Sequence, residues 1–383
     1  MKRAIQRSQE RLEKLQITSA VNTHQMKDIE TPVTPDIGSG EYLIQMAIGT
    51  PALSLSAIMD TGSDLVWTKC NPCTDCSTSS IYDPSSSSTY SKVLCQSSLC
   101  QPPSIFSCNN DGDCEYVYPY GDRSSTSGIL SDETFSISSQ SLPNITFGCG
   151  HDNQGFDKVG GLVGFGRGSL SLVSQLGPSM GNKFSYCLVS RTDSSKTSPL
   201  FIGNTASLEA TTVGSTPLVQ SSSTNHYYLS LEGISVGGQS LAIPTGTFDI
   251  QSDGSGGLII DSGTTLTFLQ QTAYDAVKEA MVSSINLPQA DGQLDLCFNQ
   301  QGSSNPGFPS MTFHFKGADY DVPKENYLFP DSTSDIVCLA MMPTNSNLGN
   351  MAIFGNVQQQ NYQILYDNEN NVLSFAPTAC DTL

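Results

Sequence analysis

Two short runs in this chain nearly repeat each other, and together they could bring two carboxylates into contact. Asp60-Thr61-Gly62-Ser63 and Asp261-Ser262-Gly263-Thr264 each follow one apolar stretch and precede another. Each run is typical of a tight turn between two strands, and each half of the chain holds one. Carboxyl groups on equivalent turns can meet across a pseudo-two-fold axis and share one proton. Such a pair can activate water for hydrolysis of an amide bond in acid.

A single run of this kind is also an ordinary strand-to-turn sequence, because Asp and Ser accept hydrogen bonds in turns and Gly adopts positive φ. The recurrence favours the catalytic interpretation, since internal self-similarity with matching flanks rarely arises by chance. The flanks are Ala57-Ile58-Met59 and Leu65-Val66-Trp67 around the first run, and Leu258-Ile259-Ile260 and Leu266-Thr267-Phe268 around the second.

The residues beside each aspartate have predicted roles of their own. The glycine of each run would let backbone amides approach the carboxylates closely. The hydroxyls of Ser63 and Thr264 would donate to the outer carboxylate oxygens. Those of Thr61 and Ser262 would bond across the axis to the backbone of the opposite loop. Taken singly, each hydroxyl is equally compatible with simple turn stabilisation.

The charge balance excludes some partners and points to a working environment. The net charge is −19 with only 17 Lys and Arg residues, which argues against a nucleic-acid surface. No apolar run is long enough to span a membrane, so no membrane partner is expected. An acidic surface can simply keep a protein soluble. It also suits a protein that works in acid, where its carboxylates are neutral and few cations repel one another.

Composition and patterning predict the organisation of the chain. Helix formers are sparse, and short alternating runs lie between Gly, Pro, Asn and Ser clusters, so we expect a fold dominated by β structure with a few short helices. We expect a first β lobe over 37–190, with an irregular cysteine-rich insert at 70–114, and a second β lobe over 191–383. The clearest helix is predicted near 272–285, with Thr272 and Asp275 forming a capping box.

The first 36 residues differ from the rest. Residues 1–28 hold six of the 17 cations, and residues 1–20 are rich in helix formers. This segment could be a floppy terminus. We favour a propeptide remnant and N-terminal extension over 1–36, because its basic helix would suit an acidic cleft. The mature N-terminus is then expected between Gln25 and Ile37. No signal peptide follows Met1, so a secreted form would have lost its signal.

The twelve cysteines predict a disulfide framework and an oxidising compartment. Cys70-x2-Cys73-x2-Cys76 could instead hold a metal. His24 and His151 lie far from it in sequence, and no second C-x2-C completes a tetrahedral set, so no metal site is expected. Asn144 begins a glycosylation sequon, Asn144-Ile145-Thr146.

From about Gly40 to Cys380 the chain resembles the pepsin-like aspartic proteases, and within them the plant nepenthesins. The resemblance rests on the two aspartate loops and on several further motifs. These are the crossing strands Leu162-Val163-Gly164 and Ile353-Phe354-Gly355, the flap Tyr120-Gly121-Asp122, the flap-supporting Trp67, the cysteine-rich insert, and the run from Phe354 to Asn361. The second lobe lacks a saposin-like insert. The implied fold is bilobal and pepsin-like.

The resemblance also implies properties of the site and its setting. Asp60 and Asp261 would be the catalytic pair, with Tyr120 closing over a polypeptide substrate and the protein's own propeptide acting as inhibitor. A secreted monomer without cofactors is expected, in the apoplast or a digestive fluid, with the vacuole as another location. The implied bridges are Cys70–Cys73, Cys76–Cys149, Cys95–Cys114, Cys100–Cys108, Cys187–Cys380 and Cys297–Cys338.

One residue departs from the family pattern. Two other classes of function are alternatives to an aspartic protease. Arg123 stands in the flap where the family has Gly, which suggests an altered turn or a cation that reaches toward substrate. Some plant proteins that share the fold have lost catalysis and bind or inhibit other enzymes, but both aspartate loops are complete here. A Ser or Cys hydrolase would need a histidine partner for its nucleophile, and the chain has only four His residues with no obvious partner placement.

Overall fold

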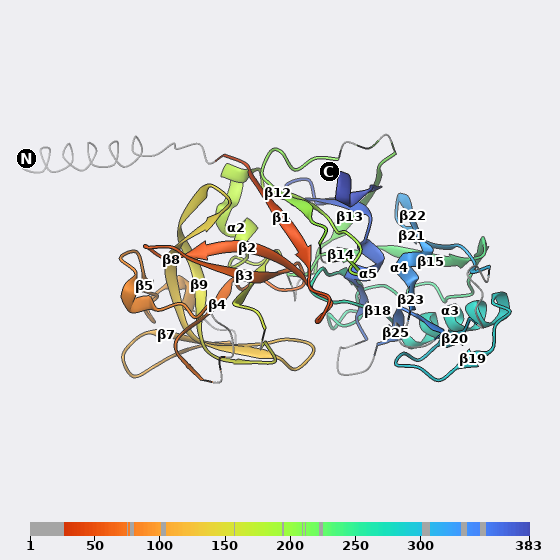
Figure 1. Cartoon of the computed structure of the whole chain (residues 1–383), viewed down its shortest axis with the longest axis horizontal. Coiled ribbons are helices and arrows are strands. Elements are labelled where there is room, and N and C mark those ends of the chain that lie inside the picture. The colour runs from red at the N-terminus through yellow and green to blue at the C-terminus, as the bar shows by residue number, and fades with distance from the viewer. Residues whose placement is uncertain are drawn as a thin grey trace, which may run out of the picture.

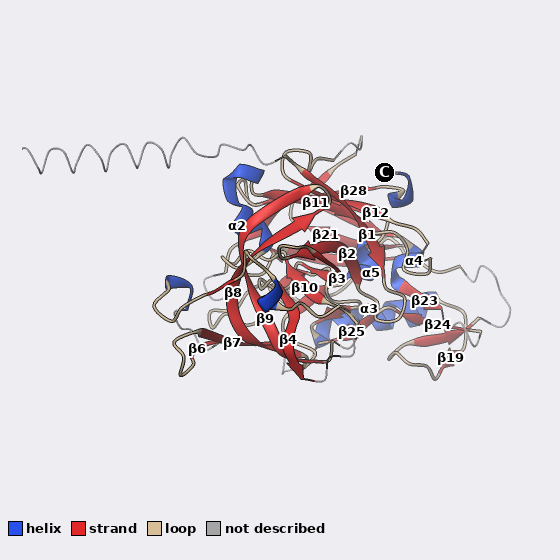
Figure 2. Cartoon of the chain, turned by 60° about the vertical axis from the view of Figure 1, so that its left-hand side comes forward, coloured by secondary structure: helices blue, strands red, loops and turns tan. Residues whose placement is uncertain are grey.

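The computed structural model of the chain is built mainly from β strands in two lobes (Figures 1 and 2). Figure 1 shows the first lobe, coloured red to yellow, beside the second, coloured green to blue. This confirms the predicted all-β-dominated, bilobal fold. The described residues are 27–74, 76, 80–100, 105–156, 158–193, 195–208, 210, 212–221, 225–300, 307–330, 335–344 and 350–383.

The first lobe is built from strands that are mostly consecutive along the chain. They are β2 (Tyr42–Ile48), β3 (Leu53–Asp60), β4 (Trp67–Thr74), β5 (Ser91–Lys92), β6 (Phe106–Cys108), β7 (Cys114–Pro119), β8 (Ser125–Ile137), β9 (Gln140–Gln154) and β10 (Gly161–Gly164). The helix α2 (Leu172–Leu176) and the 3-10 turns η1 (Pro84–Ser86), η2 (Ser98–Cys100) and η3 (Gly177–Met180) complete this lobe.

The second lobe holds shorter strands and the longest described helix. Its strands are β14 (Tyr228–Leu229), β15 (Leu231–Val236), β16 (Gln239–Ser240), β17 (Leu258–Ile260), β18 (Thr267–Leu269), β19 (Gln289–Ala290), β20 (Cys297–Asn299), β21 (Met311–Phe315), β22 (Ala318–Val322), β23 (Leu328–Pro330), β24 (Ile336–Leu339), β25 (Met341–Pro343) and β26 (Ala352–Phe354). Its helices are α3 (Gln271–Ser284), α4 (Lys324–Tyr327) and α5 (Asn356–Gln359).

An antiparallel sheet joins the lobes, in the order β1–β12–β11–β27–β28–β13. Its strands are β1 (Ile29–Pro35), β11 (Lys183–Cys187), β12 (Ser198–Ile202), β13 (Gly214–Val219), β27 (Tyr362–Asp367) and β28 (Val372–Pro377), and the 3-10 turn η5 (Cys380–Thr382) follows β28. Because the sheet takes strands from both halves of the chain, it fixes the separation of the lobes.

Strand β1 corrects the predicted N-terminal boundary. Residues 29–35 fall in the segment assigned to the propeptide and extension, yet they pair with β12 and with β2. Ile29 and Val33 are fully buried, so this stretch belongs to the folded body. Buried and exposed residues alternate along this strand, as in a strand with one face on the core. Residues 1–26 lie outside the described residues.

Helix α3 lies where a helix was predicted, but the predicted capping box is wrong. The helix begins at Gln271, and no side chain caps its N-terminus at Gln270. Thr272 therefore lies inside the first turn. The buried face of the helix carries Tyr274, Val277 and Met281, as the spacing predicts.

The disulfide pairing of the first lobe differs from the one implied by the family resemblance. The structure pairs Cys70–Cys149, Cys73–Cys76, Cys95–Cys108 and Cys100–Cys114, so the four bridges expected among these cysteines are wrong here. The two remaining bridges, Cys187–Cys380 and Cys297–Cys338, are confirmed.

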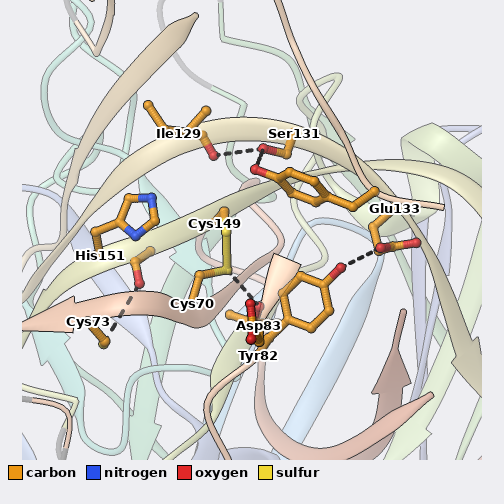
Figure 3. Close-up of a disulfide and its surroundings, with 12 residues drawn as sticks. Cys70, Cys73, Tyr82, Asp83, Ile129, Ser131, Glu133, Cys149 and His151 are labelled. Carbon is orange, nitrogen blue, oxygen red and sulfur yellow. Dashed lines mark hydrogen bonds between the residues drawn. A yellow bond between two sulfur atoms is a disulfide. The ribbon is translucent and has the colours of Figure 1, made fainter. Parts of the chain in front are cut away.

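Strand register explains the change at Cys70. Strand β4 runs parallel to β9 with Thr68 opposite Cys149. Cys70 lies two residues along the same face and is fully buried, with its Cα 5.3 Å from that of Cys149 (Figure 3). In the insert, the sulfurs of Cys95, Cys100 and Cys108 all lie within 4.8 Å of one another, so sequence spacing cannot select their partners. All of these sulfurs are bridged, which leaves none as a thiolate ligand for a metal.

Candidate active site

Each aspartate lies where a buried strand ends. Strand β3 ends at Asp60 and runs parallel to β10, which places Gly164 opposite Asp60. Strand β17 ends one residue before Asp261 and runs parallel to β26, which places Phe354 opposite Ile260. The two halves of the chain therefore build the same parallel strand pair, and an aspartate turn follows each pair.

Each carboxylate is held by its own loop. The Gly62 amide donates to Asp60 Oδ1 at 2.9 Å, and the Ser63 hydroxyl donates to Asp60 Oδ2. In the second loop the Gly263 amide donates to Asp261 Oδ1 at 2.7 Å. The Thr264 hydroxyl donates to Asp261 Oδ2 at 2.6 Å. These are the contacts that the sequence predicts for the glycines and for the last hydroxyl of each run.

The two carboxyl groups lie against the opposite loops. A methyl group added at Gly62 would lie 2.5 Å from Asp261 Oδ2, and one added at Gly263 would lie 2.3 Å from Asp60 Oδ1. Only 5% of Asp60 and 7% of Asp261 is exposed. Burial and the charge of Asp261 raise the pKa of Asp60 well above its usual value, although bonds from Ser63 and Gly62 oppose the shift. A carboxyl pair in this setting retains one proton to a higher pH than a free carboxyl would.

Reciprocal hydrogen bonds lock the two loops together. The Thr61 amide donates to Ser262 Oγ at 3.0 Å, and the Ser262 amide donates to Thr61 Oγ1 at 2.9 Å. The Ser262 hydroxyl also donates to the Met59 carbonyl at 2.8 Å. Thr61 and Ser262 are fully buried. The predicted cross-axis bonds are therefore present, with hydroxyls acting as acceptors as well as donors.

A hairpin of β7 and β8 stands beside the pair. At its tip the Tyr120 amide donates to the Ser124 carbonyl at 2.9 Å, while Gly121 and Asp122 are exposed. The indole Nε1 of Trp67 donates to the Tyr120 hydroxyl at 2.8 Å. Burial and the charge of Asp60 raise the pKa of Tyr120 well above its usual value. The predicted Trp67–Tyr120 contact is present.

Comparison with known proteins decides the family. Residues 42–204 match the family described as "Xylanase inhibitor N-terminal", and residues 226–377 match "Xylanase inhibitor C-terminal". The chain is 46% identical over 389 residues to aspartic proteinase nepenthesin-2 of Nepenthes gracilis, which covers 99% of this chain and 86% of that protein. It is 39% identical over 352 residues to aspartyl protease family protein 2 of Arabidopsis thaliana, covering 90% and 72%.

The chain belongs to the nepenthesin-type, pepsin-like aspartic proteases. It is an aspartic endopeptidase, and its substrates are polypeptides. More distant solved structures share its fold. The structure of edgp superimposes with a TM-score of 0.78 at 21% identity, over 94% of this chain and 97% of that one. Soybean basic 7S globulin superimposes with a TM-score of 0.73 at 18% identity, over 93% and 99%.

In this protease Arg123 occupies the tip of the β7–β8 hairpin, where the family resemblance predicts a glycine. The residue is exposed and adopts φ +76°, in the left-handed region that a side chain disfavours. Its amide donates to the Tyr120 carbonyl at 3.1 Å, which closes the turn. Both interpretations of Arg123, an altered turn and a cation that reaches toward substrate, stay predictions.

Sequence reasoning missed two supports of the protease site. Asp64 accepts hydrogen bonds from the Gly168 amide at 2.7 Å and from Asn225 Nδ2 at 3.3 Å, which links the first aspartate loop to the start of the second lobe. Asn356 Nδ2 donates to the carbonyls of Gly40 and Ser262, both at 3.0 Å. Asp64 directly follows the first run and Asn356 directly follows Gly355, so proximity to the motifs was the available signal.

Within the described ranges, no helix is both long and apolar enough to span a bilayer.

Proposed function

We propose that this protease hydrolyses polypeptides in acid with a water molecule held between Asp60 and Asp261. The ionised member of the pair takes a proton from the water, and the protonated member donates a hydrogen bond to the scissile carbonyl. The leaving amine is then protonated by the pair. Because the shared proton belongs to both groups, neither aspartate is assigned a fixed role. The observation that carries this proposal is that both buried carboxyls abut the glycine of the opposite loop.

Tyr120 closes over the bound substrate in this proposal, with Gly121 and Asp122 at the moving tip. The bond from Trp67 holds the Tyr120 hydroxyl in place. The ring of Phe156 supports both side chains, with centroids 4.9 Å from Trp67 and 5.3 Å from Tyr120. A hairpin held at its base and exposed at its tip is suited to exclude water from the reaction.

The cellular setting follows from charge and covalent chemistry. Six disulfides support secretion into the apoplast or a digestive fluid, or delivery to the vacuole. Asn144 is exposed at the surface of β9, as glycosylation requires. The basic segment before residue 28 acts as the inhibitory propeptide of a zymogen. Because one chain supplies both carboxyls, a monomer suffices.

Substitution of Asp60 tests this function. Asp60→Asn is expected to lower kcat on an unfolded polypeptide at pH 3 by at least about 10³-fold, because the pair can no longer share a proton. Asp253→Asn is the matched control, since Asp253 is exposed and only caps a turn through Ser255. Turnover by Asp60→Asn that equals that of the control would overturn the proposal.

The second candidate function is that of a catalytically silent binding or inhibitor protein, because the two matching family descriptions name xylanase inhibitors. Inhibition of xylanase is a property of the proteins so named. A wild-type chain that cleaves no unfolded polypeptide between pH 2 and pH 7, yet binds another enzyme, would favour this second candidate.

A further inference from the structure

Three consecutive glutamines are buried directly behind the aspartate pair, and the proposed reaction does not use them. Gln358 and Gln359 are fully buried and Gln360 is 3% exposed, at the junction of α5 with β27. A buried amide is unfavourable unless its donors and acceptor are bonded. The partners of each glutamine therefore indicate what it holds in place.

Gln359 bonds the backbone of an aspartate itself. Its Nε2 donates to the carbonyl of Asp261 at 3.0 Å and to the carbonyl of Phe354 at 2.9 Å. Its Oε1 accepts from the Tyr186 hydroxyl at 2.5 Å. Both amide hydrogens and the carbonyl oxygen of this side chain are therefore used, which fixes its orientation.

The contacts continue from Tyr186 to the other aspartate loop. The Tyr186 hydroxyl lies 2.9 Å from the Tyr366 hydroxyl, and the side chain of Thr61 interacts with the Tyr366 hydroxyl and opposes the rise of its pKa that burial causes. Both tyrosines are fully buried on adjacent strands of the sheet that joins the lobes. A continuous path thus runs from Asp261 through Gln359, Tyr186 and Tyr366 to Thr61.

Gln358 serves a different part of the lobe. Its Nε2 donates to the carbonyls of Asn326 and Ala340, and its Oε1 accepts from Thr267. None of these bonds reaches an aspartate loop. The link to the pair is therefore particular to Gln359 and is not a general property of the glutamine run.

We propose that Gln359 is a positioning residue that, through Tyr186 and Tyr366, forms a second link between the aspartate loops and sets the separation of Asp60 and Asp261. This inference rests on the proposed function of the pair. The reciprocal bonds of Thr61 and Ser262 join the loops at their tips. The Gln359 path joins them from beneath, through the sheet whose strands fix the lobes. A displacement of about 1 Å in a catalytic group can lower turnover by about 10²-fold.

Two single variants and their combination test the link. Gln359→Met keeps the length of the side chain but removes the amide, and Tyr186→Phe removes only the hydroxyl. Both substitutions keep most of the buried volume, which protects the fold. We expect kcat to fall about 10- to 100-fold in the first and about 10-fold in the second, with KM within about threefold of wild type. The double variant should be no worse than Gln359→Met, because both substitutions break the same path.

Gln363→Met is the matched control. Gln363 lies on β27, is 4% exposed, and donates to the Ser207 carbonyl at 2.9 Å. It bonds neither aspartate loop, so this variant should keep wild-type kcat while losing a comparable buried amide. Urea unfolding of all variants separates lost stability from lost positioning.

The pH profile gives a readout that a merely structural role would not move. If the carboxyls move apart, their repulsion weakens and the upper apparent pKa of the pair falls, so the alkaline limb of kcat shifts to lower pH. The other titratable groups that interact with the pair are Tyr118 and Tyr120 from the flap and Tyr186 from beneath. Burial raises the pKa of each, so they stay neutral throughout the acid range.

Wild-type kcat and an unshifted limb in Gln359→Met would overturn the inference, as would an equal loss in Gln363→Met or additive effects in the double variant. Failure of the proposed function is distinguishable, because it would appear as retained turnover in Asp60→Asn whatever Gln359 does.

Discussion

The two aspartate loops present the same groups to the carboxylates but are supported from behind by different chemistry. The carbonyl of Asp60 accepts the backbone amide of Phe165 at 2.7 Å. The carbonyl of Asp261 accepts the side-chain amide of Gln359 at 3.0 Å. Because the first support is backbone, substitution leaves it in place, whereas the second depends on one side chain. The lobe that carries the β7–β8 hairpin and the cysteine insert therefore holds the aspartate whose support from behind is harder to remove by substitution.

The symmetric part of this comparison predicts the largest effect. Gly62→Ala and Gly263→Ala each place a methyl group within 2.5 Å of the carboxylate of the opposite loop. Both variants are expected to lose about 10²- to 10³-fold in kcat, because the pair must separate. Gly233→Ala is the control, since nothing lies within 4 Å of its added methyl group. Damage from only one of the two catalytic-loop variants would show that the loops are not equivalent.

Much of this symmetry was predictable from sequence. The paired loops and the cross-axis bonds between Thr61 and Ser262 follow from short motifs in which residue type and spacing determine local geometry. The contact of Trp67 with Tyr120 was expected from the family resemblance. The partners of the insert cysteines do not follow, since strand register and loop packing decide which sulfurs meet.

Long-range supports were also beyond prediction. In the sequence, the glutamine run is informative only through the family resemblance. Its contacts with Asp261 and with Tyr186 span 98 and 173 residues of sequence. Strand β1 falls in the segment assigned to the leader because that segment is basic, and its partner β12 lies far along the chain, where sequence alone does not reveal the pairing.

The β7–β8 hairpin, to which we assign the role of a flap, belongs to one half only, which predicts an unequal contribution of the two halves to turnover. Tyr120→Phe removes the hydroxyl that Trp67 contacts at 2.8 Å. We expect kcat/KM to fall about tenfold, which corresponds to about 1.4 kcal/mol of transition-state stabilisation. Tyr90→Phe loses a comparable 2.9 Å contact with Ser131 in the same lobe and should cleave at the wild-type rate. Equal losses in both would remove the flap role from Tyr120.

Two buried carboxyls of the first lobe should respond to pH in opposite directions. Burial raises the pKa of Glu133, but hydrogen bonds from Thr89, Tyr82 and the Thr134 amide outweigh it, so its pKa lies below the usual value. Figure 3 shows the bond from Tyr82. Its stabilising contribution is therefore present above the unfolded-state pKa and is lost as the pH falls. The raised pKa of Asp60 gives the reverse, a contribution that is present in acid and lost as the pH rises.

Urea unfolding at pH 3 and pH 7 measures this difference. Glu133→Gln is expected to cost about 1 kcal/mol more at pH 7 than at pH 3. Asp60→Asn should be more stable relative to wild type at pH 7 than at pH 3. The same pH trend in both variants would contradict the opposite shifts.

The smallest effect is expected at the flap tip. Arg123→Gly relieves about 1 kcal/mol of strain at φ +76°, but glycine gains a similar entropy in the unfolded chain. The free energy of unfolding should therefore change by less than about 0.5 kcal/mol. Arg123→Lys retains both the strain and the charge, so a change in KM for acidic peptides seen only in Arg123→Gly would identify a contact of the cation with substrate.

The most direct test compares wild type with Asp261→Asn on an unfolded polypeptide from pH 2 to pH 7. We predict cleavage that is confined to acid in the wild type and absent in the variant, whose far-ultraviolet circular dichroism stays unchanged. Cleavage by the folded variant with the wild-type pH profile would contradict the carboxyl-pair account.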